Sequence, residues 1–412
     1  MDLKTVVVVN DFGYVNGGAS EVAIMSAVEL SKKHRVIFFC AVGPIDEILK
    51  DSNVEVIWLN QKWIVKEPNI FKAMIQGIWN LKAKRKFQQL LETLDRNHTI
   101  IHVHTWVKSL SSSFVSTIHS MGFKNVITLH DYFTACPNGA FYNYQKKSIC
   151  KLKPLSTNCL LSNCDKQSRL QKIWRVLRQF VQKKISKVPG GFQNFIKVSN
   201  FSEKILKPYL PKDAHIYVAE NPIRISKKDR AHVIDHQVFT SVGSIDFQKG
   251  PFLFAKGAQK AEVKAKMIGA GPLMAEVAQK YPEIEITGWL KRDQVTEALE
   301  QCRVLVLPSV WYETQGLVVL EAAALGIPAI VPDTCAARDL VEDGVTGLWF
   351  RGGDLGSLSD KMQQLKSNEQ VDKLGENAYE KYWSNPYSLR NHIGRLNDIY
   401  TEILSDNNNP ID

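Results

Sequence analysis

The sequence predicts an α/β protein with two domains, each built on a parallel sheet that helices cover on both faces. The length of 412 residues suits two domains of about 200 residues each. Short apolar runs rich in β-branched residues alternate with longer helical patterns, which is typical of parallel strands. The same alternation restarts after a charged, proline-containing segment at 217–230, so we place the join of the two domains there.

The first domain is expected over residues 1–218. A first strand at 5–10 precedes a helix at 18–34, in which Ala23, Ala27 and Leu30 form one apolar stripe. Further apolar runs predict strands at 35–40, 54–59, 99–104 and 125–130.

The second domain is expected over residues 219–385. Helices are expected at 293–302 and 316–325. The strand candidates of this domain lie at 237–243, 264–269, 284–288, 304–309 and 327–332. A last helical stretch follows at about 386–405, and residues 386–412 are a candidate for packing back on the first domain.

The composition excludes several classes of protein. The formal net charge of +10 favours an anionic partner, which is a phosphorylated ligand, a membrane surface or nucleic acid. Nucleic acid fits poorly, because the basic residues cluster on one expected helix and no recognition motif is present. The first residues are not typical of a signal peptide, and no apolar run approaches the roughly 20 residues that span a bilayer. We therefore expect a cytoplasmic protein.

Two facing α/β domains would leave a cleft between the carboxyl ends of their strands, where open sheets bind ligands. The segment WYETQGLVVLEAAALG places Glu313 and Glu321 there, around the start of a helix. The first N–H groups of that helix, from Gly316 through Leu317 to Val318, lack internal partners and suit a diphosphate. Glu321 lies roughly 7.5 Å further along at the usual helical rise, a span that fits the ribose of the same nucleotide. The alternative is a solvated Glu313 and a Glu321 that the helix dipole favours.

The pattern S-x-x-x-E-x-x-G-x-x-x-x-E-A-x-A-x-G-x-P, followed by VEDGVTGLWF, closely resembles the E-x7-E signature of retaining family 4 glycosyltransferases, which have the GT-B fold. The resemblance covers essentially the whole chain. It implies two Rossmann-like domains and a UDP-, GDP- or ADP-linked sugar donor held mainly by the second domain. It also implies that Glu313 contacts the transferred sugar and Glu321 the ribose hydroxyls. We expect no cofactor and no metal-held diphosphate, because the chain has no Asp-x-Asp triplet.

The segment SVGSIDFQKGP departs from this family at one position. The family holds the diphosphate with an arginine and a lysine; Lys249 matches the lysine, but Ser244 stands where the arginine is expected. A serine hydroxyl neither neutralises charge nor binds bidentately, so another basic residue or the helix amides would have to compensate. Two further donor contacts follow from the resemblance: a glycine turn at Gly269 and Gly271, and base contacts at Trp289 and Leu290.

In the first domain the resemblance points to two loops. Gly17 and Gly18 open a helix directly after the first strand and would approach the phosphates or the acceptor; the alternative is a simple tight turn. His130 ends a strand and would contact the donor sugar as a catalytic residue. Asp131 beside it would orient the imidazole or an acceptor hydroxyl. The alternative for His130 is a buried structural role.

Metal sites are weakly indicated. His102 and His104 alternate on one expected strand and therefore point to the same face, but no acidic or cysteine partner is near in sequence. Four cysteines crowd into one loop and admit zinc, a disulfide or plain thiols, because their spacing matches no standard zinc ribbon or finger. They are Cys136, Cys150, Cys159 and Cys164.

Residues 165–188 form a basic amphipathic segment. Eight lysines and arginines surround an apolar stripe formed by Leu170, Ile173, Trp174, Leu177 and Val181. Such a helix either packs its stripe inward as an ordinary domain helix or lies on an anionic bilayer. Both hold if the stripe packs inward while the charges face lipid, which would make the protein peripheral on the inner face of the cell membrane.

These features predict a retaining glycosyltransferase that acts on a glycan or a lipid-linked glycan in surface polysaccharide synthesis. One alternative is a sugar-nucleotide epimerase of similar fold, which needs no acceptor. The other is a weakened nucleotide-binding scaffold protein, for which Ser244 is the only support.

Overall fold

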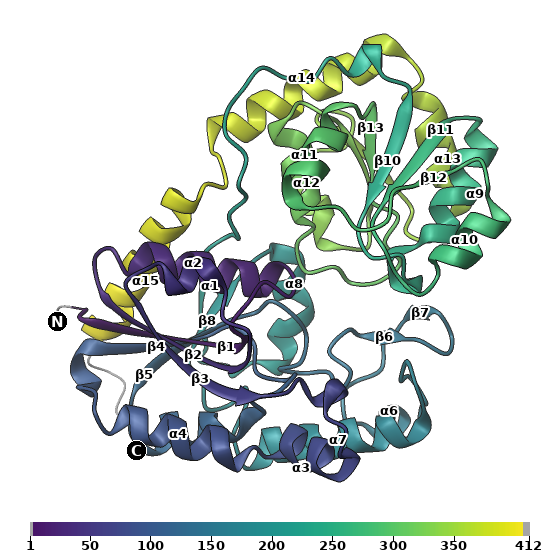
Figure 1. The fold of residues 1–412 in the computed structure, drawn as a ribbon. Coiled ribbons are helices and arrows are strands. Elements are labelled where there is room, and N and C mark those ends of the chain that lie inside the picture. Colours follow the sequence, from purple (N-terminus) through teal and green to yellow (C-terminus); the bar gives the residue numbers. More distant parts are fainter. Residues whose placement is uncertain (1–2, 407–412) are drawn as a thin grey trace.

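A computed structural model describes residues 3–406; the outermost residues of the expected ranges, 1–2 and 407–412, lie outside that description. Figure 1 shows two α/β lobes, one for each half of the chain, with the last helix lying on the first lobe. The first lobe has a seven-stranded sheet in the order β3-β2-β1-β4-β5-β8-β9, with every pairing parallel. The bounds are β1 (Thr5–Phe12), β2 (Arg35–Val42), β3 (Val54–Gln61), β4 (Thr99–Val103), β5 (Lys124–Thr128), β8 (Asn194–Lys197) and β9 (His215–Val218).

The second lobe has a six-stranded sheet in the order β12-β11-β10-β13-β14-β15, also parallel throughout. Its strands are β10 (Val238–Val242), β11 (Lys264–Ile268), β12 (Glu285–Ile286), β13 (Val304–Val306), β14 (Ala329–Pro332) and β15 (Gly347–Phe350). In both sheets the first strand of the domain is central and the strand order reverses beside it, between β1 and β4 and between β10 and β13. Ligands bind at such reversal points, beyond the carboxyl ends of the strands.

The helices of the first lobe are α1 (Gly18–Leu30), α2 (Glu47–Lys50), α3 (Ile70–Ile78), α4 (Leu81–Leu91), α5 (Val115–Ser120), α6 (Thr157–Leu161), α7 (Arg169–Lys184) and α8 (Asn200–Leu206). The helices of the second lobe are α9 (Pro251–Ala261), α10 (Met274–Lys280), α11 (Arg292–Glu300), α12 (Leu317–Ala324), α13 (Leu355–Gln364) and α14 (Asn368–Ser384). The last helix is α15 (Leu389–Ser405). A small antiparallel pair, β6 (Tyr142–Asn143) and β7 (Ser148–Ile149), lies in the long connection between β5 and α7. None of the helices in the described part of the chain is long and apolar enough to cross a membrane.

The central strands are buried on both faces, as their apolar runs predict. All eight residues of β1 are buried. Val7 and Val9 pack in a cluster with α4 and α5, whereas Val6 and Val8 pack in a separate cluster with α1 and α15. Alternate side chains of one strand therefore support two helical layers, which requires apolar residues at every position.

The C-terminal helix α15 packs on the first sheet. His392 Nε2 lies 3.0 Å from Ser26 Oγ of α1, and Tyr400 Oη lies 2.6 Å from His102 Nδ1 of β4. The connection after β9, from Ala219, and the turn between α14 and α15 are the two places where the chain passes between the lobes.

Candidate active site

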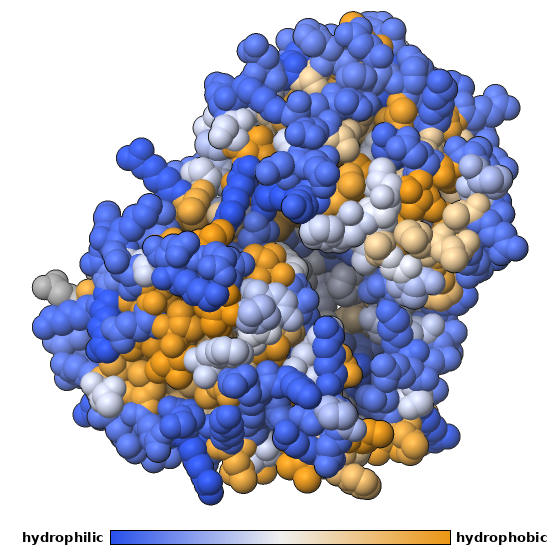
Figure 2. All heavy atoms as spheres, viewed as in Figure 1, coloured by the Kyte–Doolittle hydropathy of each residue, from blue (hydrophilic) through white to orange (hydrophobic). Residues whose placement is uncertain are grey.

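The carboxyl edges of the two sheets face each other. Thr314, in the loop before α12, donates its hydroxyl to the carbonyl of His130 after β5, at 2.9 Å. A Cβ atom added to Gly18 would lie 3.4 Å from Leu317 Cδ1, so the start of α1 faces the start of α12. Figure 2 shows the surface hollowed where the two lobes meet. The loops expected to form the site therefore lie on opposite walls of one cleft.

Lys249 and Glu313 form a half-buried ion pair on the second wall of the cleft. The Lys249 ammonium donates to Glu313 Oε1, and the Ser309 hydroxyl donates to Glu313 Oε2 at 2.7 Å. The Glu313 side chain is 13% exposed. Burial alone would raise the pKa of Glu313, but the charge and hydrogen bond of Lys249 and the bond from Ser309 outweigh it and lower that pKa. Glu313 is therefore an ionised acceptor of hydrogen bonds.

The helix α12 starts at the same edge. Its N-cap, Gly316, has φ 91°, a left-handed conformation that favours glycine and turns the chain abruptly into the helix. The N–H groups of Leu317 and Val318 in the first turn have no acceptor within the helix. They and the helix dipole make this end attractive to an anion.

Glu321 of α12 belongs to an ion-pair network that joins the two lobes. Arg292 Nη2, at the start of α11, lies 3.1 Å from Glu321 Oε1, and Arg292 Nη1 donates to Glu21 of α1. Arg224 in the connection between the lobes lies 3.8 Å from Glu21. Burial raises the pKa of Glu321, the charge of Arg292 opposes that rise, and Glu21 adds to it.

The glycine turns are required by close packing of two loops. Gly269 has φ 143°, and a Cβ atom there would lie 1.9 Å from the carbonyl oxygen of Gly243. A Cβ atom on Gly271 would lie 2.5 Å from the carbonyl oxygen of Ile245. The loops after β10 and β11 thus touch through their backbones, so contact between the loops explains these glycines before any ligand is considered.

Two expected donor contacts lie at the edge of this arrangement. Ser244 is exposed beside a cavity of about 20 Å³ that Lys249 also lines. Trp289 is 74% exposed, and the turn that holds it lies next to Gly269, because Gly269 N donates to Gly288 O at 2.9 Å. Leu290 is half-buried in the same turn. No described contact joins Trp289 or Leu290 to Glu313 or Glu321.

On the first wall His130 is held by another histidine. His104 Nδ1 lies 2.9 Å from His130 Nε2, and the two rings stack. Burial, with the charge of His392, lowers the pKa of His130 to about 3, so both rings are neutral at physiological pH. His104 Nε2 is buried without a partner. A buried acceptor without a partner costs less than a buried N–H without one, which favours donation from His104 Nδ1–H to His130 Nε2. His130 then carries its proton on Nδ1.

The other residues expected on this wall have separate contacts. Asp131 Oδ1 accepts from the N–H of Phe133 at 2.9 Å, and burial raises the pKa of Asp131 to about 6. Asp131 thus stabilises the following turn, and no described hydrogen bond joins it to the His130 imidazole. Gly17 has φ 123° with open space around its Cα, so it gives the first wall a bare stretch of backbone.

Four residues of the site are not predicted from the sequence: Ser309, His104, Glu21 and Arg292. The sequence indicates His104 only as half of a metal pair with His102. His102 instead lies 2.6 Å from Tyr400 Oη and 2.7 Å from Thr128 Oγ1. Glu21 and Arg292 stand in the first turns of α1 and α11. Both are charged residues at the starts of helices, but no local pattern in the sequence joins them.

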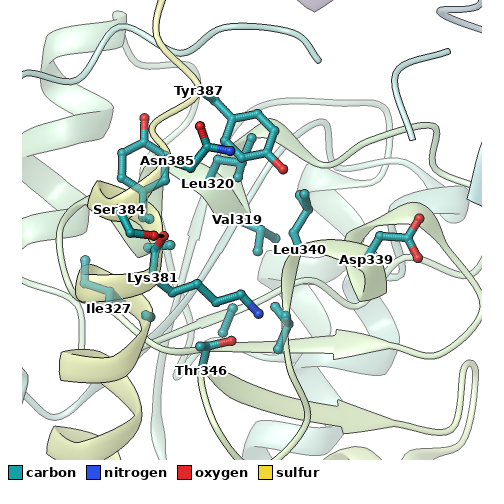
Figure 3. Close-up of a pocket in the computed structure, with 15 residues that line it drawn as sticks. Val319, Leu320, Ile327, Asp339, Leu340, Thr346, Lys381, Ser384, Asn385 and Tyr387 are labelled. Atoms are coloured by element: carbon teal, nitrogen blue, oxygen red, sulfur yellow. Dashed lines mark hydrogen bonds between the residues drawn. The ribbon is translucent and has the colours of Figure 1, made fainter. Parts of the chain in front are cut away.

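One cavity of the second lobe lies away from the cleft. Figure 3 shows a cavity of about 220 Å³ lined by Val319, Leu320, Lys381 and Tyr387. Val319 and Leu320 lie on a different face of α12 from Glu321, as the helical period requires. This cavity is therefore behind the candidate site, and we base the site on the Lys249 and Glu313 geometry.

The cysteine loop packs around a lysine. All seven cysteines are free thiols. Lys172 Nζ of α7 lies 3.2 Å from Cys164 Sγ and 3.6 Å from Cys159 Sγ, and Cys136 donates to Asn138 Oδ1 at 3.1 Å. Within residues 3–406 no group of three or more His, Cys, Asp or Glu side chains is arranged to hold a metal ion. The ammonium of Lys172 lies where a cation shared by Cys159 and Cys164 would lie.

The second domain matches a known family of proteins. Residues 223–381 match the family described as Glycosyl transferases group 1. The O-antigen chain mannosyltransferase C of Escherichia coli is 23% identical over 256 residues, 59% of this chain and 68% of that protein. The E. coli UDP-Gal:alpha-D-GlcNAc-diphosphoundecaprenol alpha-1,3-galactosyltransferase is 25% identical over 181 residues, 40% of this chain and 46% of that protein. The chain thus matches from about half to two thirds of the length of these relatives.

The fold has close structural counterparts. Anabaena HepE, solved in complex with UDP and glucose, superposes with a TM-score of 0.66 at 12% identity, covering 97% of this chain and 100% of that chain. The prediction of a GT-B fold with two Rossmann-like domains is confirmed. The family match is confined to the second domain, at residues 223–381, whereas the likeness of fold extends over both domains.

Proposed function

We propose that the protein is a retaining, metal-independent glycosyltransferase that moves a sugar from a nucleotide-diphosphate donor to a glycan or lipid-linked glycan acceptor. One observation carries the proposal: the Lys249–Glu313 ion pair lies at the same cleft edge as the start of α12, with Glu321 further along that helix. This arrangement offers one cation, several free N–H groups and two carboxylates to a single elongated ligand.

Each part of a nucleotide sugar has a matching group. The diphosphate would rest on the N–H groups of Leu317 and Val318 and draw the Lys249 ammonium away from Glu313. Glu313, held by Ser309, would then accept hydroxyls of the sugar, and Glu321 those of the ribose after release of Arg292. The donor would therefore exchange partners within existing ion pairs.

The chemical step develops negative charge on the departing diphosphate. Lys249 and the start of α12 are fixed donors at the place where that charge appears, so their stabilisation increases towards the transition state. Ser244 adds at most one neutral hydrogen bond there, which leaves Lys249 as the main positive charge. On the opposite wall, neutral His130 is suited to donate a hydrogen bond to the donor sugar, and Gly17, Gly18 and Asp131 border the acceptor side.

The relatives indicate where to begin the search for substrates. The names of the two E. coli proteins refer to an O-antigen chain and to a diphosphoundecaprenol-linked sugar, and that of HepE to UDP and glucose. From these names we propose a UDP-linked sugar as the first donor to test, and surface polysaccharide synthesis as the process in which the protein acts.

A thermal-shift screen of UDP, GDP, ADP and their sugar conjugates tests donor binding. A ligand that binds the native state raises the unfolding temperature, and Glu321→Ala should abolish that rise. Glu297→Ala, an exposed carboxylate on α11, is the matched control and should keep it. The proposal fails if no nucleotide stabilises the protein, or if both variants respond alike.

A transfer assay with the stabilising donor then separates the alternatives. Transfer to acceptor, with the anomeric configuration kept in the product by NMR and rates unchanged by EDTA, supports the proposal. Isomerised donor without acceptor would indicate an epimerase. Binding without turnover over a panel of donors and acceptors would indicate a scaffold protein.

A further inference from the structure

Helix α7 is inverted relative to an ordinary surface helix. The alternative in which its apolar stripe packs inward is wrong for three of the five stripe residues, Leu170, Ile173 and Leu177, whose side chains face outward. Leu170 is 78% exposed, Ile173 58%, Leu177 53% and Phe180 45%. Its buried residues are instead the polar Lys172, Arg178, Gln179 and Gln182.

The inversion has a physical cause in the loop beneath the helix. Arg178 Nη2 donates to Pro137 O at 2.9 Å, and Gln182 Nε2 donates to Phe133 O at 2.8 Å. Lys172 reaches the thiols of the same loop. The inner face of α7 thus meets irregular backbone whose carbonyls need donors. These bonds fix the rotation of the helix and leave its apolar stripe outside.

Helix α3 extends the exposed apolar surface. Phe71 is 79% exposed, Ile70 69% and Ile75 67%, and only Gln76 and Gly77 of this helix are buried. Trp174 of α7 donates to Met74 O at 3.1 Å. A Cβ atom on Gly77 would lie 2.5 Å from the Trp174 ring, so the two helices are in direct contact. Their outward stripes form one surface, which we call the α3–α7 face.

The α3–α7 face lies along the lower side of the first lobe. Figure 1 places α3, α7 and α6 together there, and Figure 2 shows apolar side chains gathered at the same lower edge. Leu160 and Leu161 of α6, 43% and 68% exposed, continue the apolar character. Such an extended apolar surface indicates an interaction site.

The charge around this face is strongly positive. Residues 62–91 carry seven lysines and arginines with one acidic residue, and residues 166–188 carry eight with none. These two segments therefore hold a formal +14, whereas the whole chain holds +10, so the rest of the protein is net −4. Exposed basic residues of the segments include Lys66, Lys82, Arg85, Arg169, Lys183 and Lys184.

We infer that the α3–α7 face docks on an anionic lipid bilayer, with its apolar side chains in the interface and its basic residues at the headgroups. A second copy of the chain fits poorly, because two surfaces rich in exposed lysines and arginines would repel each other. Nucleic acid also fits poorly, because binding to its phosphates would not require exposed apolar side chains such as Phe71 and Leu170. Docking of this face would keep the cleft near a substrate held in the bilayer. The link between docking and a lipid-linked acceptor rests on the proposed function.

Sedimentation of the full chain with vesicles tests the docking without any donor or acceptor. We expect binding to phosphatidylcholine vesicles that contain 30% phosphatidylglycerol, and weak binding to pure phosphatidylcholine. Binding should fall as NaCl rises from 50 to 500 mM, because salt screens the attraction of exposed charges. The double variant Phe71→Gln/Leu170→Gln should bind at least about tenfold more weakly, since it removes two apolar side chains that the bilayer would bury.

The matched control is Ile234→Gln, which changes a 40% exposed apolar residue of the second lobe and should bind as the wild type does. Equal binding by the double variant and the wild type, or no preference for anionic vesicles, would overturn the inference. So would a double variant that changes the oligomeric state and not vesicle binding. The nucleotide thermal shift of the double variant should be normal, so a failure here is distinct from a failure of the proposed function.

Discussion

The side chains of Lys249 and Glu313, 64 residues apart in the chain, form an ion pair at the carboxyl edge of the second sheet. Lys249 ends the turn after β10, and Glu313 lies in the loop after β13. These strands are neighbours at the point where the strand order reverses, which is why residues so distant in sequence meet.

The ion pair gives a prediction for catalysis. Lys249→Met keeps the length of the side chain but removes its charge, so we expect kcat to fall about 10²–10³-fold, as for loss of one preorganised donor. Nucleotide binding through Glu321 should change less. The control is Lys256→Met, an exposed lysine of α9. Steady-state kinetics measure the kcat of both variants. A kcat of Lys249→Met equal to that of the wild type would refute a catalytic role for this charge.

His104 is expected to act as a positioning residue for His130. His104→Ala should lower kcat about tenfold, the equivalent of one lost hydrogen bond, while KM for the donor changes little. His104→Asn places an N–H near the position of Nδ1 and should restore most of the loss. A merely structural role would give no such rescue, so equal activities of the two variants would contradict the assignment.

The buried histidines predict acid sensitivity. Burial lowers the pKa of His102, His104, His119, His130 and His392 in the folded state, so below about pH 6.5 the unfolded chain binds more protons than the native one. Asp131, with a raised pKa of about 6, opposes part of this effect.

The free energy of unfolding should therefore fall by roughly 2–3 kcal/mol between pH 7 and pH 6. Urea unfolding at the two pH values measures this difference. His104→Asn removes one titrating group and should reduce the difference by about a fifth. Equal stability at pH 7 and pH 6 would show that these imidazoles are not buried in the neutral form.

Gly269 is expected to be far less replaceable than a glycine with positive φ that has open space around it. Gly269→Ala would bring Cβ against the backbone of Gly243, so we expect a loss of about 3 kcal/mol or more in unfolding free energy. Gly344 has φ 75° with nothing near its Cα, and Gly344→Ala should cost only about 1–2 kcal/mol. Similar unfolding midpoints for the two variants would contradict the close loop contact.

The strands that could be predicted are those with near-continuous apolar runs. The expected strand at 5–10 is the core of β1, and that at 304–309 contains β13. The sequence does not predict the short strands β8, β9 and β15, because runs of four residues in mixed polar surroundings carry little periodic signal. The helix expected at 18–34 ends earlier, at Leu30, where the polar segment SKKH begins.

Site residues that share one loop could be predicted from the sequence, because their spacing forms a motif. Contacts between the two lobes could not be predicted. Glu313, Gly316 and Glu321 share one segment with a recognisable spacing. Arg292 and Glu21 are paired only because the lobes face each other, and no local pattern gives that contact. In α7 the sequence gives an amphipathic stripe but not the side that is buried. That side depends on the loop carbonyls beneath it.

The central claim is that α12 and Lys249 bind the diphosphate of a nucleotide whose ribose reaches Glu321. A crystal structure with a bound nucleoside diphosphate measures this directly. The account expects phosphate oxygens within hydrogen-bond distance of Lys249 and the first N–H groups of α12, with the ribose hydroxyls on Glu321 and Arg292 displaced. A nucleotide bound elsewhere, with the pair of Arg292 and Glu321 intact, would contradict it.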